Sequence, residues 1–127
     1  MPHLETELNI EFSNIRHAKG SLYVAVYDRA DAFLKVEKVR AQKIVPVIQT
    51  GSLKISLGNL PPGWYAVSSF HDVNGNGKLD TNLLGIPNEP YAFSNNARPR
   101  FRAPKWAEAV FELKEPGGAI AVRLEKW

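Results

Sequence analysis

Apolar residues at every second position constrain this chain more than any other feature of its sequence. Near the start, Leu8, Ile10 and Phe12 alternate with polar residues, and residues 119–124 repeat the pattern near the other end. A period of two places one set of side chains in a core and the other in water, as in a β-strand. No stretch shows a helical period of any length. The chain is therefore expected to be all-β.

Segments of this kind recur between turn signals along the whole chain. The expected strands are residues 8–12, 21–27, 41–48, 52–57, 64–70, 110–113 and 119–124. Residues 21–27 are apolar on both faces, which indicates a central strand. Pro46 cannot donate a ladder hydrogen bond, which favours an edge position for residues 41–48. About seven short strands separated by turns predict a β-sandwich, with a hairpin signal at residues 115–118.

Length and composition limit the alternatives. The 127 residues fit one domain, residues 1–127, in which a long loop at 71–105 separates two strands. The absence of cysteine excludes disulfides and thiolate metal sites. No apolar run is long enough to cross a membrane. Because no apolar signal region follows Met1, we expect a cytoplasmic chain or a mature form without its targeting segment.

The start of the long loop has the spacing of a calcium-binding loop. Oxygen-bearing residues occupy alternate positions, and Gly77 stands where the chain must turn sharply. The predicted ligands are the side chains of Asp72, Asn74, Asn76 and Asp80 and the backbone carbonyl of Lys78. Hard oxygen ligands in an irregular shell suit Ca²⁺ better than Mg²⁺, which requires a smaller octahedron. The sequence therefore predicts a calcium site after the strand 64–70.

The calcium motif departs from its full pattern at the twelfth position, where Leu83 replaces a bidentate glutamate. Glu89 is the candidate replacement, and further amide oxygens are available from Asn82, Asn88, Asn95 and Asn96. With two charged ligands inside the loop, we expect weak binding, roughly 10⁻⁴ to 10⁻³ M. Asp and Asn alternating with Gly are also typical of metal-free Asx-turns, so turn chemistry stays open as the alternative.

The same segment resembles a known bacterial family. Residues 71–82 (HDVNGNGKLDTN) and 85–97 (GIPNEPYAFSNNA), followed by Pro104 and residues 107–111, are similar to the DUF2141 family over nearly the whole chain. The resemblance implies a small exported β protein of uncharacterised function, periplasmic or secreted, whose targeting segment is absent here. In that setting calcium is available at millimolar levels, so a weak site is filled.

A second resemblance concerns the turn at residues 60–67, LPPGWYAV. It is similar to a turn of transthyretin-like and carboxypeptidase regulatory-like sandwiches, where it leads into a core strand. This resemblance implies a seven-stranded immunoglobulin-like or prealbumin-like topology.

The first functional hypothesis is a non-catalytic binding or structural module. Calcium orders the long loop, which presents Tyr91, Phe93 and Trp106 to a protein or glycan partner, because aromatic rings anchor interfaces at small entropic cost. The alternative is that these rings pack beneath the loop as a satellite core. No nucleic-acid motif accompanies the nearby basic residues, so nucleic acid is not an expected partner.

Two other hypotheses stay open. A hydrolase-type enzyme would use His71 as general base with Asp72 or Glu89 as its partner, although no nucleophile motif or triad is present. Alternatively, Arg98, Arg100 and Arg102 bind an anionic surface or polysaccharide, with a solvated loop that balances nearby carboxylates as the plainer reading.

Overall fold

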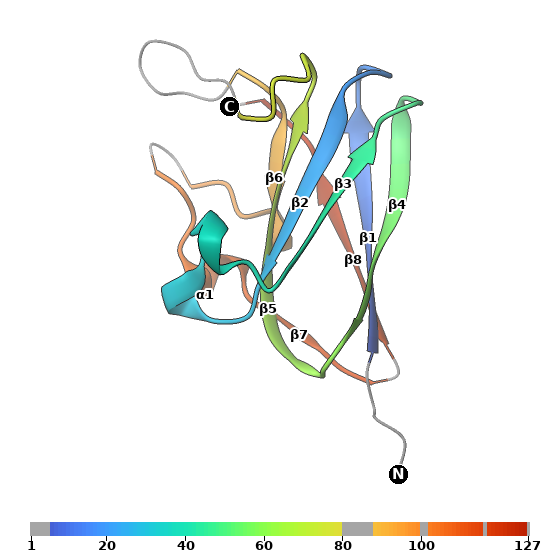
Figure 1. Cartoon of the computed structure of the whole chain (residues 1–127). Coiled ribbons are helices and arrows are strands. Elements are labelled where there is room, and N and C mark those ends of the chain that lie inside the picture. Colours follow the sequence, from blue (N-terminus) through green and yellow to red (C-terminus); the bar gives the residue numbers. More distant parts are fainter. Residues whose placement is uncertain (1–5, 80–87, 100–101, 116, 127) are drawn as a thin grey trace.

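A computed structural model describes residues 6–79, 88–99, 102–115 and 117–126. The strands in this part of the chain are β1 (Thr6–Ile15), β2 (Ser21–Tyr27), β3 (Ala41–Pro46), β4 (Gly51–Leu60), β5 (Gly63–Asp72), β6 (Tyr91–Phe93), β7 (Phe111–Leu113) and β8 (Gly117–Arg123) (Figure 1). The helical elements are the 3-10 turns η1 (Ala30–Ala32), η2 (Val36–Lys38) and η3 (Ser94–Asn96), and the α-helix α1 (Trp106–Ala109).

The described strands form two sheets. One has the order β4-β1-β8, and the other has the order β3-β2-β5-β6, with β7 paired to an earlier part of β5. The all-β sandwich predicted from the alternation is therefore confirmed, with eight strands among the described residues rather than seven. The immunoglobulin-like or prealbumin-like topology stays a prediction.

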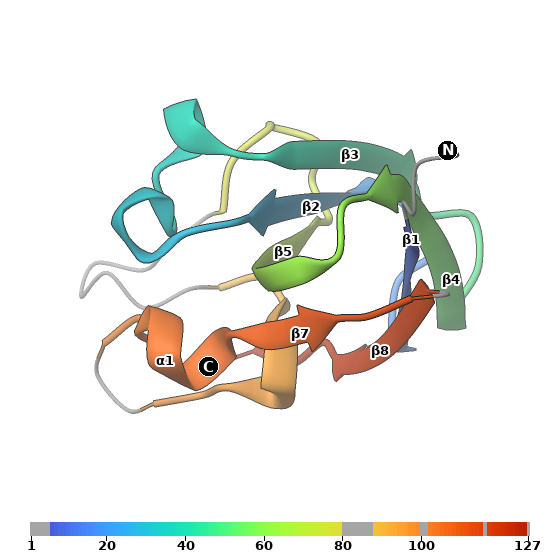
Figure 2. The same ribbon diagram turned by 90° about the horizontal axis from the view of Figure 1, so that it is seen from below.

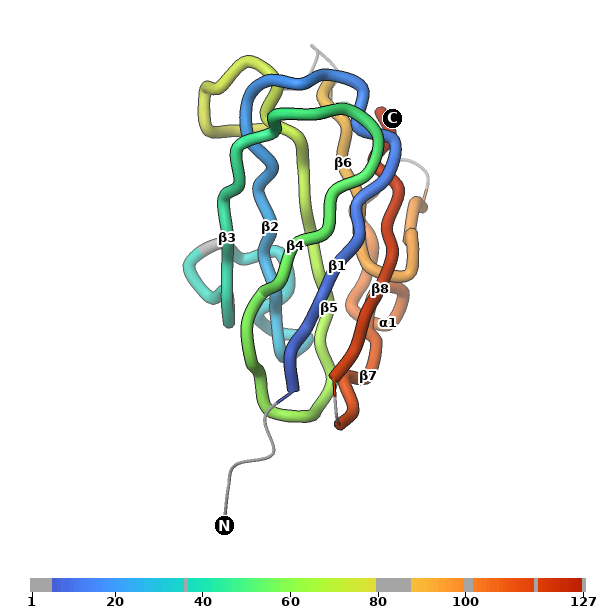
Figure 3. Tube along the Cα trace, turned by 90° about the vertical axis from the view of Figure 1, so that its right-hand side faces the viewer, coloured from blue at the N-terminus to red at the C-terminus, as the bar shows by residue number. Residues whose placement is uncertain are grey.

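β1 is the middle strand of the first sheet, antiparallel to β4 and parallel to β8 (Figure 3). Leu8, Ile10 and Phe12 are fully buried, while the polar residues between them face outward or lie half-buried. The period of two thus predicted both the strand and its core face. The parallel pairing joins strands that are far apart in the sequence, and sequence spacing gives no signal for such pairing.

β2 lies between β3 and β5 in the second sheet, and β3 is at the edge, as predicted for both (Figure 2). Leu22, Val24 and Val26 of β2 face the core and are buried, whereas Tyr23 and Ala25 face outward and are half-buried. The apolar character of both faces therefore has two causes, the core on one side and an aromatic outer face on the other.

The chain changes sheets between β4 and β5 through the Pro-Pro-Gly turn. The hydroxyl of Tyr65 donates a hydrogen bond to the carbonyl of Pro61 at 2.6 Å. Burial raises the pKa of Tyr65, so the hydroxyl stays protonated and remains a donor. A tyrosine that binds the backbone a few residues upstream is typical of strand corners in Greek-key sandwiches. The hydrogen bond fixes the angle at which β5 leaves the turn.

Two sequence-based expectations need correction. The segment 71–105 is not a single loop, because its residues Tyr91–Phe93 form β6 and pair with residues 68–70 of β5. The signal at 115–118 does not make a hairpin, because β7 pairs with β5 while β8 pairs with β1 in the other sheet. The turn residues marked where the chain reverses, but the sheet that each strand joins depends on packing.

In the described part of the chain, no helix is long and apolar enough to span a bilayer.

β5 has a break in its pairing that Ser94 fills. One edge of β5 pairs with β2, and the other pairs first with β7 at residues 63–65 and then with β6 at residues 68–70. Between these ladders, the amide of Val67 donates to the hydroxyl oxygen of Ser94 at 2.9 Å, and that hydroxyl donates to the carbonyl of Ala109. All three residues are fully buried. A single side chain therefore satisfies two buried backbone groups.

We predict that Ser94→Ala lowers the free energy of unfolding by about 2–4 kcal/mol, because it leaves a buried N–H and a buried C=O without partners. The measurement is chemical denaturation, with the exposed Ser52→Ala as the matched control. The control is expected to stay within about 0.5 kcal/mol of the parent. Equal losses in the two variants would contradict the role given to Ser94.

Candidate functional site

The candidate site begins at the end of β5, where two buried polar residues follow one another. His71 and Asp72 are each 1% exposed. Successive side chains of a strand point to opposite faces, so His71 faces the interior of the sandwich and Asp72 lies on the outer side, beneath the following loop. The two side chains are therefore directed to different environments by the strand itself.

Asp72 organises the loop that follows it. Its two carboxylate oxygens accept hydrogen bonds from the amides of Asn76 at 3.2 Å and Gly77 at 2.7 Å. Asn74 accepts a bond from the amide of Asn76 at 3.2 Å, and Asn76 accepts one from the amide of Lys78 at 3.1 Å. The side chains of Asp72, Asn74 and Asn76 thus turn their oxygens inward on the coil of the loop. These bonds are Asx-turn chemistry, and they also gather the oxygens that a cation would use.

Glu89 joins the same loop from a later part of the chain. One of its carboxylate oxygens accepts the amide of Val73 at 2.8 Å and lies 3.5 Å from the amide of Asn74. Its side chain is buried at 6% exposure. The backbone bond from His71 to the carbonyl of Pro90, at 2.9 Å, holds this return of the chain in register. The residue proposed to replace the missing twelfth ligand therefore lies at the loop.

The structure does not bring all of the predicted ligands together. Asn95 donates to the carbonyls of Glu108 and Val110, and Asn96 accepts the amide of Arg123, so both serve the packing of η3. Asn88 is exposed. Asp80, Asn82 and Leu83 lie outside the described residues. In the part of the chain that is described, no three acidic or histidine side chains form a metal-binding cluster.

Gly20, in the turn between β1 and β2, anchors the start of the loop, although its sequence context indicated only a turn. Its φ is +68°, and a Cβ at this position would lie 2.0 Å from the carbonyl oxygen of Asp72 and 2.9 Å from that of Val73. Only glycine permits both the backbone conformation and the close approach. The turn and the loop therefore pack backbone against backbone.

His71 is held by this same turn. Its Nε2 lies 2.7 Å from the carbonyl oxygen of Lys19, so Nε2 carries the proton and donates. Its Nδ1 is buried and has no hydrogen-bond partner among the described residues. A general base needs an orienting partner on its second nitrogen, and here neither Asp72 nor Glu89 bonds to the ring. The histidine serves the packing of the turn against β5.

The predicted aromatic ligand residues lie in two separate clusters. Tyr91 is buried and meets Phe93 edge to face, with ring centroids 5.9 Å apart. Trp106, half-buried in α1, meets the ring of Phe33 at 6.1 Å, and Phe33 in turn meets Tyr27 at 5.6 Å. These three predicted residues do not form one exposed surface.

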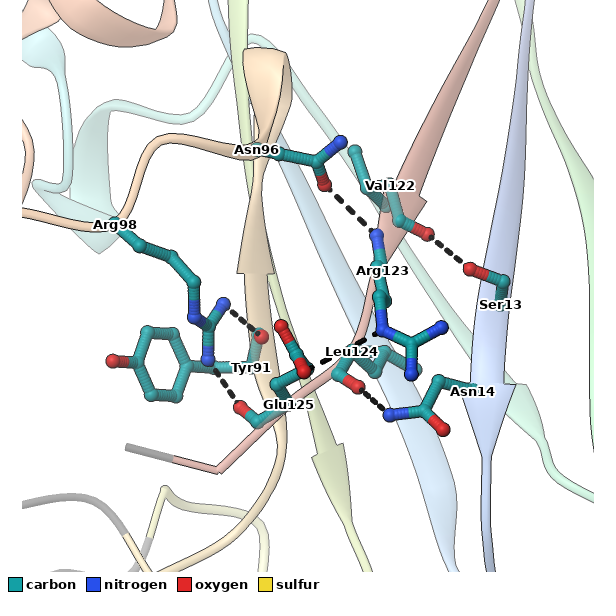
Figure 4. Close-up of polar contacts among 9 residues, drawn as sticks. All are labelled: Ser13, Asn14, Tyr91, Asn96, Arg98, Val122, Arg123, Leu124 and Glu125. Atoms are coloured by element: carbon teal, nitrogen blue, oxygen red, sulfur yellow. Dashed lines mark hydrogen bonds and ion pairs between the residues drawn. The ribbon is translucent and has the colours of Figure 1, made fainter.

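Arg98 binds the backbone of its own chain (Figure 4). It donates to the carbonyl of Tyr91 at 2.9 Å and to the carbonyl of Glu125, and its guanidinium carbon lies 4.1 Å from the centre of the Tyr91 ring. These contacts join β6 to the segment after β8. Arg98 therefore has a structural role, because its guanidinium donates hydrogen bonds to backbone carbonyls of the chain itself.

Arg102 forms a two-pronged ion pair with Glu108, at 2.7 and 2.9 Å. Glu108 also accepts the amide of Lys105 at 2.8 Å, which caps the first turn of α1. The hydrogen bond from Arg102, followed by that from Lys105, lowers the pKa of Glu108 to about 2. The same pair raises the pKa of Arg102. Arg100 lies outside the described residues.

An outward-facing aromatic pair on the second sheet was missed in the sequence. The rings of Tyr23 and Phe70, neighbours across β2 and β5, stack with centroids 4.9 Å apart and planes 13° apart. Beside them is a hollow of about 130 Å³, whose lining includes the small residues Ala25 and Ser68 and the exposed Ile44. The sequence of β2 does indicate this outer aromatic residue, because Tyr23 alternates with the core residues and therefore points to the opposite face of the sheet.

The aromatic hollow adjoins the loop. A Cβ placed at Gly77 would lie 3.6 Å from the hydroxyl of Tyr23, so the turn of the loop lies beside this hydroxyl. The oxygen-lined loop and the aromatic hollow therefore lie side by side.

We predict that Gly20→Ala destabilises the protein by more than about 3 kcal/mol, because a methyl group there requires the loop backbone to move. The control is Gly58→Ala, where φ is +81° but no atom lies within 4 Å of the added carbon. That variant is expected to lose only the conformational cost of about 1–2 kcal/mol. Denaturation midpoints check both, and similar losses would show that Gly20 does not anchor the loop.

The ion pair of Glu108 makes a pH prediction. Because the folded pKa of about 2 lies below the ordinary value of 4.5, the pair stabilises the fold above pH 4.5, and this contribution is lost as the pH falls toward 2. Its size is small because the pair is exposed. NMR titration of Glu108 is expected to show a midpoint near 2 that moves toward 4.5 in Arg102→Gln. An unchanged midpoint in the variant would contradict the assignment.

Comparison with known proteins identifies the family. A family profile described as "Uncharacterized protein conserved in bacteria (DUF2141)" matches residues 10–120, which extend from β1 to β8. Neither the curated proteins nor the solved structures contain a match. The matched region includes the loop, Glu89 and the aromatic hollow. The chain belongs to the DUF2141 family.

Proposed function

We propose that the protein is a non-catalytic binding module, periplasmic or secreted, in which calcium orders the loop that follows β5. The observation that carries this proposal is the return of Glu89 to the loop headed by Asp72. Both carboxylates are buried, at 6% and 1% exposure. Two like charges buried at one loop are stabilised by a cation between or beside them.

The chemistry of the donors favours calcium over other ions. Asp72, Asn74, Asn76 and Glu89 supply carboxylate and amide oxygens, and hard oxygen ligands select calcium or magnesium rather than zinc or copper. The irregular path of the loop suits the larger ion, which tolerates a range of coordination numbers. The low charge of the ligand set gives an affinity of roughly 10⁻⁴ to 10⁻³ M, suited to a setting with millimolar calcium.

The neighbouring aromatic hollow suggests what calcium binding at the loop would control. The loop lies beside Tyr23, which forms part of the aromatic hollow together with Phe70. A cation that fixes the loop therefore fixes one side of the hollow. A volume of about 130 Å³ accommodates one ring-sized group, such as the side chain of a protein partner or one residue of a glycan. Tyr23 and Phe70 take the role that the sequence suggested for Tyr91, Phe93 and Trp106.

The test is thermal unfolding with calcium. At 10-fold to 100-fold above the dissociation constant, binding to the native state adds roughly 1.4–2.7 kcal/mol, a rise of about 4–12 °C in Tm. Magnesium at the same concentration is expected to give a smaller rise. Asn76→Asp adds a charged ligand and is expected to enlarge the calcium response.

Asp72→Asn keeps an oxygen acceptor but removes the charge, so it is expected to abolish the rise whatever its own Tm. Asp31→Asn, an exposed residue paired with Arg29, is the matched control and should keep the full response. If the calcium response survives in Asp72→Asn, or if the parent protein shows no response, the loop is not a calcium site. Its Asp and Asn residues then serve only as Asx-turns.

A further inference from the structure

A second hollow lies at the end of the sandwich where the turn after β1 meets the segment after β8. Its volume is about 330 Å³. The lining includes Arg16 and His17 from the turn, Pro90 before β6, and Leu124 and Lys126 from the last segment. We propose that this hollow binds a small organic oxyanion, a carboxylate or phosphate with a short carbon body.

The charge of the lining supports an anionic ligand. Arg16 and Lys126 are cations, and neither forms an ion pair with a described residue. One acidic residue, Glu125, also lines the hollow, but its carboxylate lies 3.4 Å from the guanidinium of Arg123. Arg16 therefore contrasts with Arg98 and Arg102, whose donors bind backbone or carboxylate groups of the chain.

The wall formed by the last segment is held from both sides (Figure 4). On the side of β1, the amide of Leu124 donates to the carbonyl of Ser13 at 3.1 Å. The side chain of Asn14 donates to the carbonyl of Leu124 at 2.7 Å, as Figure 4 shows. On the side of β6, Tyr91 and Glu125 exchange backbone bonds at 3.0 and 3.2 Å. A ligand at this wall meets backbone that is already ordered, which lowers the entropic cost of binding.

The size of the hollow points to a ligand larger than a bare ion. Small-molecule sites typically have volumes of about 300–1,000 Å³, and this hollow lies at the lower end of that range. Pro90 and Leu124, both buried, are the apolar residues of the lining. The exposed Arg16 carries a guanidinium, a group that matches the two oxygens of a carboxylate or phosphate. Carboxylate and phosphate share this recognition chemistry, so the experiment must separate them.

The experiment is NMR titration of the full chain, without calcium and at low salt, with glycerol phosphate, succinate, inorganic phosphate and uncharged glycerol as separate probes. We expect saturable shifts at residues 14–17 and 124–126 with glycerol phosphate or succinate, and the stronger of the two identifies the anion class. Binding should weaken as salt is added. Glycerol is expected to cause no saturable shift.

Two variants make the result decisive. Arg16→Gln is expected to weaken binding about tenfold, because it removes a charge-assisted hydrogen bond. Lys114→Gln, which removes the same charge beyond β7, is expected to leave the affinity unchanged. Equal weakening in both variants, or shifts that do not saturate, would mean that anions are attracted by general surface charge and not bound in the hollow. Either result would overturn the proposal. If inorganic phosphate binds as tightly as glycerol phosphate, the proposal that the ligand has a carbon body is wrong.

Discussion

The need to pair every buried amide of β5 is the constraint on which the rest of this structure depends. β5 is satisfied by β2 along one edge, but along the other it requires two short strands, β7 and β6, with the hydroxyl of Ser94 between them. Those partners come from far along the chain, so the segment after β5 must return to the sheet. The same return brings Glu89 to the loop and Tyr91 beneath Arg98. Fold and candidate site therefore have one cause.

The parts of the fold that the sequence predicted are those with a period. Ten-residue and seven-residue strands such as β1 and β2 carry enough alternating positions to reveal their core faces. β6 has three residues, and its existence depends on the unpaired edge of β5, which no local pattern encodes. The hairpin predicted at 115–118 was wrong for a related reason. Glycine and proline indicate a change of chain direction, but they do not indicate which sheet the next strand joins.

The candidate site was predictable to the extent that its chemistry is local. The alternation of Asp72, Asn74 and Asn76 predicted their oxygens to converge, and the hydrogen bonds of the loop follow that spacing. The roles of Arg98 and Arg102 were not predictable, because their partners are backbone carbonyls and a carboxylate placed by the fold. Gly20 was informative only once the close approach to Asp72 was known. A residue that acts through contact with a distant segment leaves no mark in sequence spacing.

The polar groups of this protein divide by whether the fold uses them. Ser94 and Arg98 supply backbone groups with hydrogen bonds that regular strand pairing does not make, and Arg102 is paired with the carboxylate of Glu108. Arg16 and Lys126 take no such part among the described ion pairs, and they border a hollow whose backbone is ordered by others. The turn after β1 separates the two proposed sites, with Arg16 at one and Gly20 against Asp72 at the other. The calcium loop and the oxyanion hollow that we propose both lie at strand ends, where rigid sheets hold short turns in place and backbone pairing leaves side chains available.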